Sequence, residues 1–538
     1  MKISFSLNEQ QVETEVELHE TLLQLLRRRG MISVRYGSDS GETGAGAVLI
    51  DGKLTSTDCM LAAQIDGHDV LTVEWFNKPE LHPIQAAFVA TGAMQSGYST
   101  PAMILGTWEL LNRNPNPTEH EVRDMLSGIL DRETAYVKPV EAVMRAAALM
   151  RGETNEPFGP VYLPPLTDGK NPVDVSPDDD GPDASPAVPR VVPSKDVPEM
   201  AVVGKPEVKV DAVRLVKGNP AFTDDFEERG QLIAKVLRSP HAHANIIDID
   251  DTEAVALSGV HAVIHYKNTP RVKYASGGQS WPNPHPHDQV SFDNKVRHVG
   301  DRVAAVAAET KEIAQAALGL IKVEYEILPY VLDEIETMEP DSPVIHDEAD
   351  TEEIYDADRN IVLRIEAERG DVENGAKEAD HVFEDTFKVH QVQQVPIEPH
   401  ISVAWLDSDE RLVVRTATQV PFHVRRMLAP LIGRDIKDVR VIKPRIGGGF
   451  GAKQEMLIED IVAHLAIATR RPVKLELDRS EEFIASRSRH PQTLTFTTGV
   501  EDSGKLVSQK LRLIGNTGPY GTHGQTVQTV AGLRGLTS

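Results

Sequence analysis

One stretch of the chain, residues 151–200, has too few apolar side chains to belong to a packed core. It is rich in proline and carries the acidic run Asp178–Asp180. Such a composition buries too little apolar surface to offset the entropy lost on ordering. We therefore predict an extended, partly stiff spacer that divides the chain into two parts. The 538 residues leave room for several domains around it.

The part before the spacer predicts two small domains. In residues 1–78, Ile3–Phe5 and Val12–Val16 alternate as the strands of a hairpin do, and Thr21 is placed to cap an apolar helix. Residues 79–150 have helical apolar periodicity throughout, including a capping-box pattern at Thr118 and Glu121. We expect a small α/β domain followed by a helical bundle.

The part after the spacer predicts mixed α/β structure. Val303–Ala308 is an apolar strand, and from about residue 380 strands alternate with helices, among them a helix predicted over 455–468. The overall fold class is therefore multidomain α/β and α+β.

The overall composition excludes several classes of function. The formal net charge is −26 and the pI is about 5.2, which argues against nucleic acid or an anionic membrane as a partner. There is no apolar run long enough to span a membrane and no secretory signal at the N-terminus. The one cysteine, Cys59, excludes an intrachain disulfide and favours a reducing compartment. We expect a cytoplasmic protein.

A Gly/Ser-rich loop at residues 37–46 has the spacing of an iron–sulfur site without its ligands. Positions 38, 43 and 46, followed by Cys59, match the spacing of plant-type 2Fe–2S cysteines. The first three positions are occupied by Ser38, Thr43 and Gly46. Because such a cluster needs four thiolates, we expect no cluster here.

A second glycine-rich loop, residues 446–454, is the strongest candidate for a site. Three successive glycines precede Phe450. Glycines permit positive φ and close backbone approach, so their N–H groups can face an anionic or oxo ligand.

Several motifs together resemble the xanthine dehydrogenase/aldehyde oxidoreductase family of molybdenum hydroxylases. The matching segments lie at residues 81–83, 95–101, 114–117, 131–136, 210–212, 238–244, 299–304, 418–421, 446–454, 471–474 and 516–520. The resemblance implies a ferredoxin-like β-grasp domain (1–78), a helical 2Fe–2S-binding domain (79–150), an a/b hammerhead domain (201–335) and the N-terminal part of a molybdopterin-binding domain (336–538).

The resemblance also implies that a second cluster is lost. The family's four cysteines of the helical domain fall on Ser96, Ser99, Asp131 and Glu133. We expect both domains to keep their folds without clusters. The two carboxylates are interpreted as solvated surface acids, with another metal as the open alternative.

For the active site, the resemblance implies a molybdenum–pterin cofactor at Gly448, Gly449, Phe450 and Gly451. Phe450 would pack on the substrate ring. Gln454 stands where purine-oxidising members carry a glutamate, so purine recognition would be altered or the substrate would differ. A family glutamine near the molybdenum oxo group is expected at Val392, or one residue away.

The implied activity is hydroxylation of a heterocycle or aldehyde with water as the oxygen source. No catalytic residue is assigned, because the family's base glutamate is expected beyond Ser538, in a further segment or a second chain. Electrons would leave to a partner protein or directly from the cofactor, and the resemblance allows a homodimer. Two alternatives stay open: a non-catalytic scaffold or assembly protein, and degenerate domains that dock cluster-bearing partners.

Overall fold

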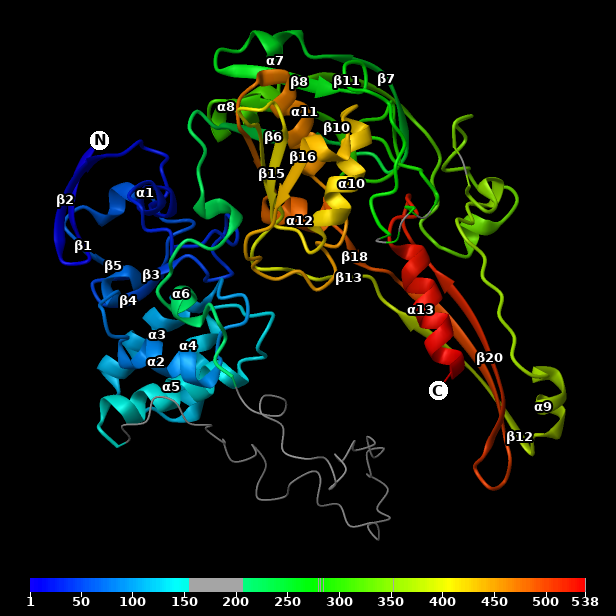
Figure 1. Ribbon diagram of the computed structural model, residues 1–538, viewed down its shortest axis with the longest axis horizontal. Coiled ribbons are helices and arrows are strands. Elements are labelled where there is room, and N and C mark those ends of the chain that lie inside the picture. The colour runs from blue at the N-terminus through cyan, green and yellow to red at the C-terminus, as the bar shows by residue number, and fades with distance from the viewer. Residues whose placement is uncertain (154–206, 279, 281, 284, 352, 538) are drawn as a thin grey trace. The chain divides into compact units, whose positions relative to one another are not determined.

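The computed structural model describes residues 1–153, 207–278, 280, 282–283, 285–351 and 353–537. The predicted spacer therefore lies almost wholly outside the described residues. The chain forms two compact units, whose elements are labelled in Figure 1. The first comprises residues 1–36 and 40–219, and the second comprises residues 37–39 and 220–538.

The first unit contains a five-stranded mixed sheet in the order β2-β1-β5-β3-β4. The strands are β1 (Lys2–Leu7), β2 (Gln10–Glu15), β3 (Ala47–Ile50), β4 (Lys53–Ser56) and β5 (Asp69–Leu71). Alternate residues of β1, including Ile3 and Phe5, are buried in one core with helix α1 (Leu22–Arg28). Thr21 caps α1 in a reciprocal box with Gln24. The predicted hairpin and cap are confirmed.

A helical bundle completes this unit. Its helices are α2 (Pro83–Thr91), α3 (Thr100–Arg113), α4 (Glu119–Ser127) and α5 (Val137–Met150). The predicted capping box is present at α4, where the Thr118 N–H donates to the Glu121 carboxylate at 2.8 Å and the Glu121 N–H donates to the Thr118 hydroxyl at 3.3 Å.

A short helix from beyond the spacer also packs on this bundle. The Gln85 amide on α2 donates to the Val216 carbonyl at the end of α6 (Ala212–Val216), at 3.1 Å. A Cβ on Gly97 would lie only 2.9 Å from Leu215 of α6. Residues 207–219 thus belong with the first unit, although the sequence analysis grouped them with the hammerhead, because nothing local in the sequence encodes these contacts.

The second unit is built on a seven-stranded sheet in the order β16-β15-β14-β17-β6-β10-β8. Its strands are β6 (Leu232–Arg238), β8 (Val260–His265), β10 (Arg302–Ala308), β14 (Ile401–Leu406), β15 (Leu412–Thr416), β16 (Val439–Ile442) and β17 (Val473–Glu476). Strand β17 pairs in parallel with β6. One sheet therefore spans the boundary predicted at residues 335 and 336, and its core includes α10 (Pro421–Leu431) and α11 (Glu459–Thr469).

Helix α11 begins later than the predicted residue 455. The Met456 N–H donates to the Ser276 carbonyl at 3.2 Å, and the Leu457 and Ile458 N–H groups donate to the Glu459 carboxylate at 2.9 and 3.1 Å. These N–H groups are bound outside a helix, so residues 455–458 remain an extension of the glycine loop.

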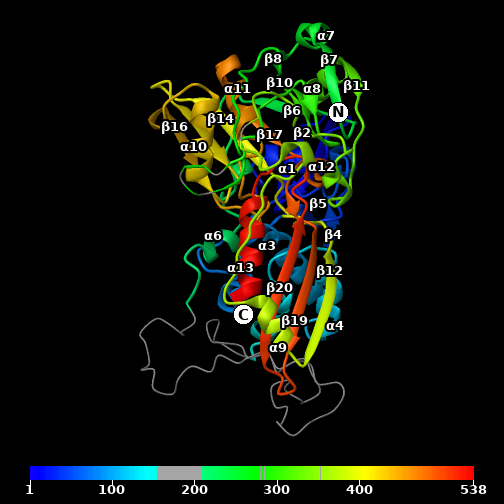
Figure 2. The same ribbon diagram turned by 90° about the vertical axis from the view of Figure 1, so that its right-hand side faces the viewer.

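Two three-stranded sheets and one two-stranded sheet also lie in the second unit. The sheet β11-β7-β9 combines β7 (Ala244–Asp250), β9 (Lys295–Val296) and β11 (Lys322–Ile327), with helices α7 (Thr252–Ala256) and α8 (Lys311–Leu318) nearby. The sheet β12-β19-β20 combines β12 (His381–Val389), β19 (Gln492–Val500) and β20 (Leu506–Gly515), with α9 (Val372–Glu378). Helix α13 (Gly524–Thr537) lies along β20 (Figure 2).

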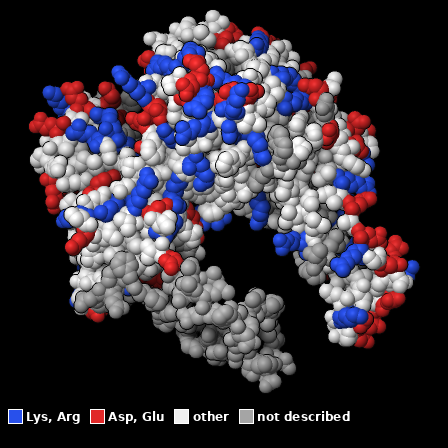
Figure 3. All heavy atoms as spheres, viewed as in Figure 1, with Lys and Arg blue, Asp and Glu red and all other residues white. Residues whose placement is uncertain are grey.

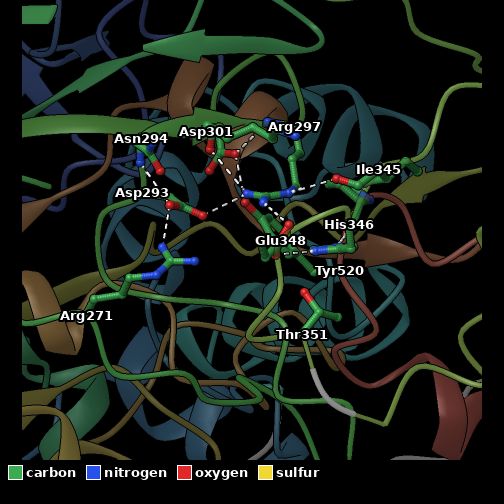
Figure 4. Close-up of polar contacts among 12 residues, drawn as sticks. Arg271, Asp293, Asn294, Arg297, Asp301, Ile345, His346, Glu348, Thr351 and Tyr520 are labelled. Atoms are coloured by element: carbon green, nitrogen blue, oxygen red, sulfur yellow. Dashed lines mark hydrogen bonds and ion pairs between the residues drawn. The ribbon is translucent and has the colours of Figure 1, made fainter. Parts of the chain in front are cut away.

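A buried polar network fastens three distant segments of the second unit (Figure 4). The Arg297 guanidinium donates to the carboxylates of Asp293 and Glu348, at 2.9 Å each. The Arg297 N–H donates to Asp301, which also accepts from the Tyr520 hydroxyl at 2.8 Å. Buried charges are tolerated when they are paired in this way.

The helices of the described residues show no membrane-spanning character, and the charged side chains are of both signs. On the face drawn in Figure 3, basic and acidic side chains are interspersed. Within the described ranges, no helix combines the length and apolar character needed to cross a membrane.

Candidate functional site

The glycine loop, residues 446–454, connects β16 to the segment that leads into α11. Gly448 has φ +98°, and a Cβ there would lie 2.9 Å from the Phe450 ring. A Cβ on Gly449 would lie 2.6 Å from Oε1 of Gln419. Both positions therefore require glycine. Phe450 itself has φ +53° and a side chain 41% exposed, and such backbone strain in a non-glycine residue is typical of functional sites.

A buried ion pair holds the two ends of this loop. The Glu398 carboxylate accepts from the Gly447 N–H at 2.7 Å and from the Lys453 ammonium at 2.9 Å. The same ammonium donates to the Glu398 carbonyl at 2.8 Å. Because both side chains are almost fully buried, loss of one partner would leave an uncompensated charge, which costs about 3–5 kcal/mol.

A second buried pair, between His400 and Glu482, contacts the loop at the Ala452 carbonyl. His400 Nδ1 lies 2.8 Å from the Glu482 carboxylate at helix α12 (Arg479–Ala485), and Nε2 lies 3.3 Å from the Ala452 carbonyl. Both ring nitrogens of His400 therefore face hydrogen-bond acceptors. Burial raises the pKa of Glu482, but the charge and hydrogen bonds of His400 outweigh it and lower that pKa to about 2.

Gln419 contacts the loop, a contact that the sequence analysis did not predict. Its side-chain Oε1 accepts from the Gly451 N–H at 3.2 Å, and its backbone N–H donates to the Lys453 carbonyl at 2.8 Å. The position expected for the family's glutamine, Val392, lies in β13 (Val392–Gln393), which pairs with β18 (Ser488–Arg489). The amide of Gln393, the residue one position away, donates to the Glu482 carbonyl at 2.6 Å.

The loop has the features expected of a binding site for an anionic or oxo group. Gly448 and Gly449 are buried, and their N–H groups make no hydrogen bond to the described residues. Gln454 is half-buried, and within the described chain its side-chain amide is likewise without a hydrogen-bond partner. Gly448 and Gly449 thus present two buried N–H groups without partners, at positions that have no room for a Cβ. Together the two groups form a cradle in which a ligand would accept hydrogen bonds.

Comparisons with known proteins identify the family. Family models match residues 72–144 ("2Fe-2S binding domain"), 217–329 ("Aldehyde oxidase and xanthine dehydrogenase, a/b hammerhead domain") and 354–536 ("Molybdopterin cofactor-binding domain"). The nicotinate dehydrogenase large molybdopterin subunit of Eubacterium barkeri is 34% identical over 61% of this chain and 74% of that subunit. The chain belongs to the xanthine dehydrogenase/aldehyde oxidoreductase family of molybdenum hydroxylases.

Two relatives match almost the whole chain. The probable hypoxanthine oxidase of Escherichia coli (strain K12) is 37% identical over 98% of this chain and 55% of its own length. The structure of aldehyde oxidoreductase from Desulfovibrio gigas matches with a TM-score of 0.82 and 25% identity, over 98% of this chain and 55% of that one. The chain thus spans about half the length of these two molybdenum hydroxylases.

The family's second cluster position is filled by a hydrogen-bonded carboxylate. The Glu133 side chain accepts from the Ser96 N–H at 2.6 Å, while Ser96 and Ser99 are buried. Burial raises the pKa of Glu133, and the hydrogen bonds from Ser96 oppose that rise. Glu133 is therefore not the solvated acid that the sequence suggested. In the described ranges, no group of three or more His, Cys, Asp or Glu side chains could hold a metal ion.

Three of the four positions expected to hold the first cluster also carry residues other than cysteine. Thr43 and Gly46 are buried in the first unit, and Cys59 is exposed. Ser38 is buried and belongs to the second unit. A hydroxyl group and a glycine do not replace the thiolate ligands that hold iron in such clusters.

Proposed function

We propose that this chain is part of a molybdenum hydroxylase that oxidises a heterocycle or an aldehyde, and that its loop 446–454 contacts both the substrate and the cofactor. The observation that carries the proposal is the glycine loop, in which Gly448 and Gly449 present unpaired buried N–H groups beside a half-exposed phenylalanine. A scaffold protein would have no need of such a cradle, and none of the comparisons favours that alternative.

The residues present fit a molybdenum–pterin cofactor. The N–H groups of Gly448 and Gly449 would hold its oxo or anionic edge, with Phe450 and Gly451 completing the loop around them. When bound, the cofactor would supply the two-electron oxidation that places a water-derived oxygen on the substrate carbon. The loop's own part is to bind and orient, and the Glu398–Lys453 pair keeps it in position.

The substrate contacts proposed are Phe450 and Gln454. The exposed phenylalanine ring offers a surface for a planar ring to pack on. The Gln454 amide both donates and accepts hydrogen bonds but carries no charge. It therefore suits a neutral, polar edge of a ring or a carbonyl group. We assign no base to this chain and propose that a glutamate of a further segment or second chain serves as one.

We also propose that the chain binds no iron–sulfur cluster. Seven of the eight expected ligands are residues other than cysteine. Electrons would leave to a partner protein or to an acceptor that meets the cofactor directly. The single cysteine supports a cytoplasmic location.

The deciding experiment is elemental analysis for molybdenum and iron. The protein would be purified from its native source together with whatever co-purifies, and each chain would then be analysed. We expect molybdenum with iron near background on this chain. The absence of both metals would overturn the enzymatic proposal and favour the scaffold alternative. Stoichiometric iron on this chain would overturn the assignment of the seven replaced ligands.

A further inference from the structure

Gln454, the proposed substrate contact, lies between two residues that are both held in place. On one side, Lys453 is locked by its buried ion pair with Glu398. On the other side, Glu455 is buried and is not part of a helix. Gln454 itself contributes only a backbone hydrogen bond, from its N–H to the Gly451 carbonyl at 3.2 Å. These contacts hold the chain on both sides of Gln454.

The Glu455 carboxylate is held by two residues that are distant in sequence. Its Oε2 accepts from the Ser276 hydroxyl at 2.7 Å and from the Arg487 guanidinium. Burial raises the pKa of Glu455, but the charge of Arg487 and the Ser276 hydrogen bond outweigh it and lower that pKa. The carboxylate is therefore ionised and needs both donors.

Ser276 contacts both the side chain and the backbone that follow Gln454. Its hydroxyl donates to Glu455 and accepts from the Gln289 amide at 3.1 Å and the Arg487 guanidinium at 3.0 Å. One donor and two acceptor sites are all that a serine hydroxyl offers. Its carbonyl accepts from the Met456 N–H at 3.2 Å.

The same carbonyl reaches the helix that follows Gln419. His423 Nε2, on α10, lies 2.9 Å from the Ser276 carbonyl. Ser276 is fully buried in the segment between β8 and β9, within the hammerhead match, whereas Glu455, Arg487 and His423 lie in the molybdopterin-binding match. One serine of the hammerhead thus connects the segment that carries Gln454 with the helix that follows Gln419.

We propose that Ser276 is a positioning residue that holds the backbone beside Gln454 through Glu455 and so governs which ligands the site distinguishes. This inference rests on the proposed function only in taking Gln454 as the substrate contact. Loss of the hydroxyl would remove one of two donors from a buried carboxylate and free the segment that follows Gln454.

The test compares Ser276→Ala with Ser402→Ala in the full chain. Ser402, on β14, is equally buried, and its hydroxyl has no hydrogen-bond partner within the described residues. Amide hydrogen exchange would be followed over residues 447–456, with α8 as an internal reference. We expect exchange about tenfold faster in the loop of Ser276→Ala and unchanged in α8, because only local opening is eased. Ser402→Ala should leave both unchanged.

A second readout is the ratio of the affinities for hypoxanthine and benzaldehyde as probes. We expect that ratio to change several-fold in Ser276→Ala alone, which a merely structural serine would not cause. If Ser276→Ala does not fold, Gln289→Met is the second variant, because it removes the amide that donates to the Ser276 hydroxyl. We expect loop exchange and the affinity ratio to change in the same direction as for Ser276→Ala, but by less. Unchanged loop exchange in a folded variant would overturn the inference whatever the metal content. Absence of molybdenum would overturn the proposed function and leave the exchange result standing.

Discussion

At the scale of single residues, the glycine loop depends on backbone conformations that side chains rarely adopt. We predict that Gly448→Ala lowers the free energy of unfolding by about 1–3 kcal/mol, because its φ of +98° is strained for alanine and the new Cβ would meet the Phe450 ring. Urea unfolding would measure the change, and molybdenum content should fall with it. Gly319→Ala is the matched control, since its added Cβ makes only ordinary contact, at 3.4 Å, in the same unit. Equal losses in both variants would contradict the argument.

Single residues also show what the sequence could predict about the site. The glycines and Phe450 were proposed as site residues because the glycine run, together with the flanking segments 418–421 and 471–474, resembles the family's loop. The contact of Gln419 with Gly451 was not predicted, because it is made across 32 positions in the sequence. Ser276 has no motif at all. Its proposed role rests only on the five partners that the fold brings to it.

At the scale of elements, the pair between Glu482 of helix α12 and His400, which contacts the loop, makes the free energy of unfolding depend on pH. The pKa of Glu482 is lowered from 4.5 to about 2, so its contribution is present above pH 4.5 and is lost as the pH falls toward 2. We predict that Glu482→Gln is less stable than the wild type near neutral pH, and that its free energy of unfolding falls less steeply as the pH is lowered from 4.5 toward 2. Unfolding free energies measured across the window would test this. Glu373→Gln, on the exposed helix α9, should retain the wild-type slope; a wild-type slope in Glu482→Gln would contradict the prediction.

The elements themselves were predicted well where their signals are local. The caps at Thr21 and Thr118 depend on residues three positions apart, and both are confirmed. The start of α11 was predicted four residues early, because the N–H of Met456 is bound by Ser276. The pairing of β17 with β6 joins residues more than 200 positions apart, and no local pattern reports it.

At the scale of the whole molecule, we propose that seven of the eight cluster ligands are replaced, and four of these positions lie in the helical domain matched by the 2Fe–2S-binding family model. Glu133 still reaches the backbone of Ser96, so the two cluster segments of the helical domain remain in contact. We predict that the quadruple variant Ser96→Cys, Ser99→Cys, Asp131→Cys and Glu133→Cys binds a 2Fe–2S cluster on anaerobic reconstitution, because four thiolates are the ligands such a cluster needs. Visible absorption and the iron-to-protein ratio would measure it. The triple variant that keeps Glu133 should bind far less iron. If the quadruple variant folds but stays colourless, the helical domain has lost the geometry of the cluster site as well as its ligands.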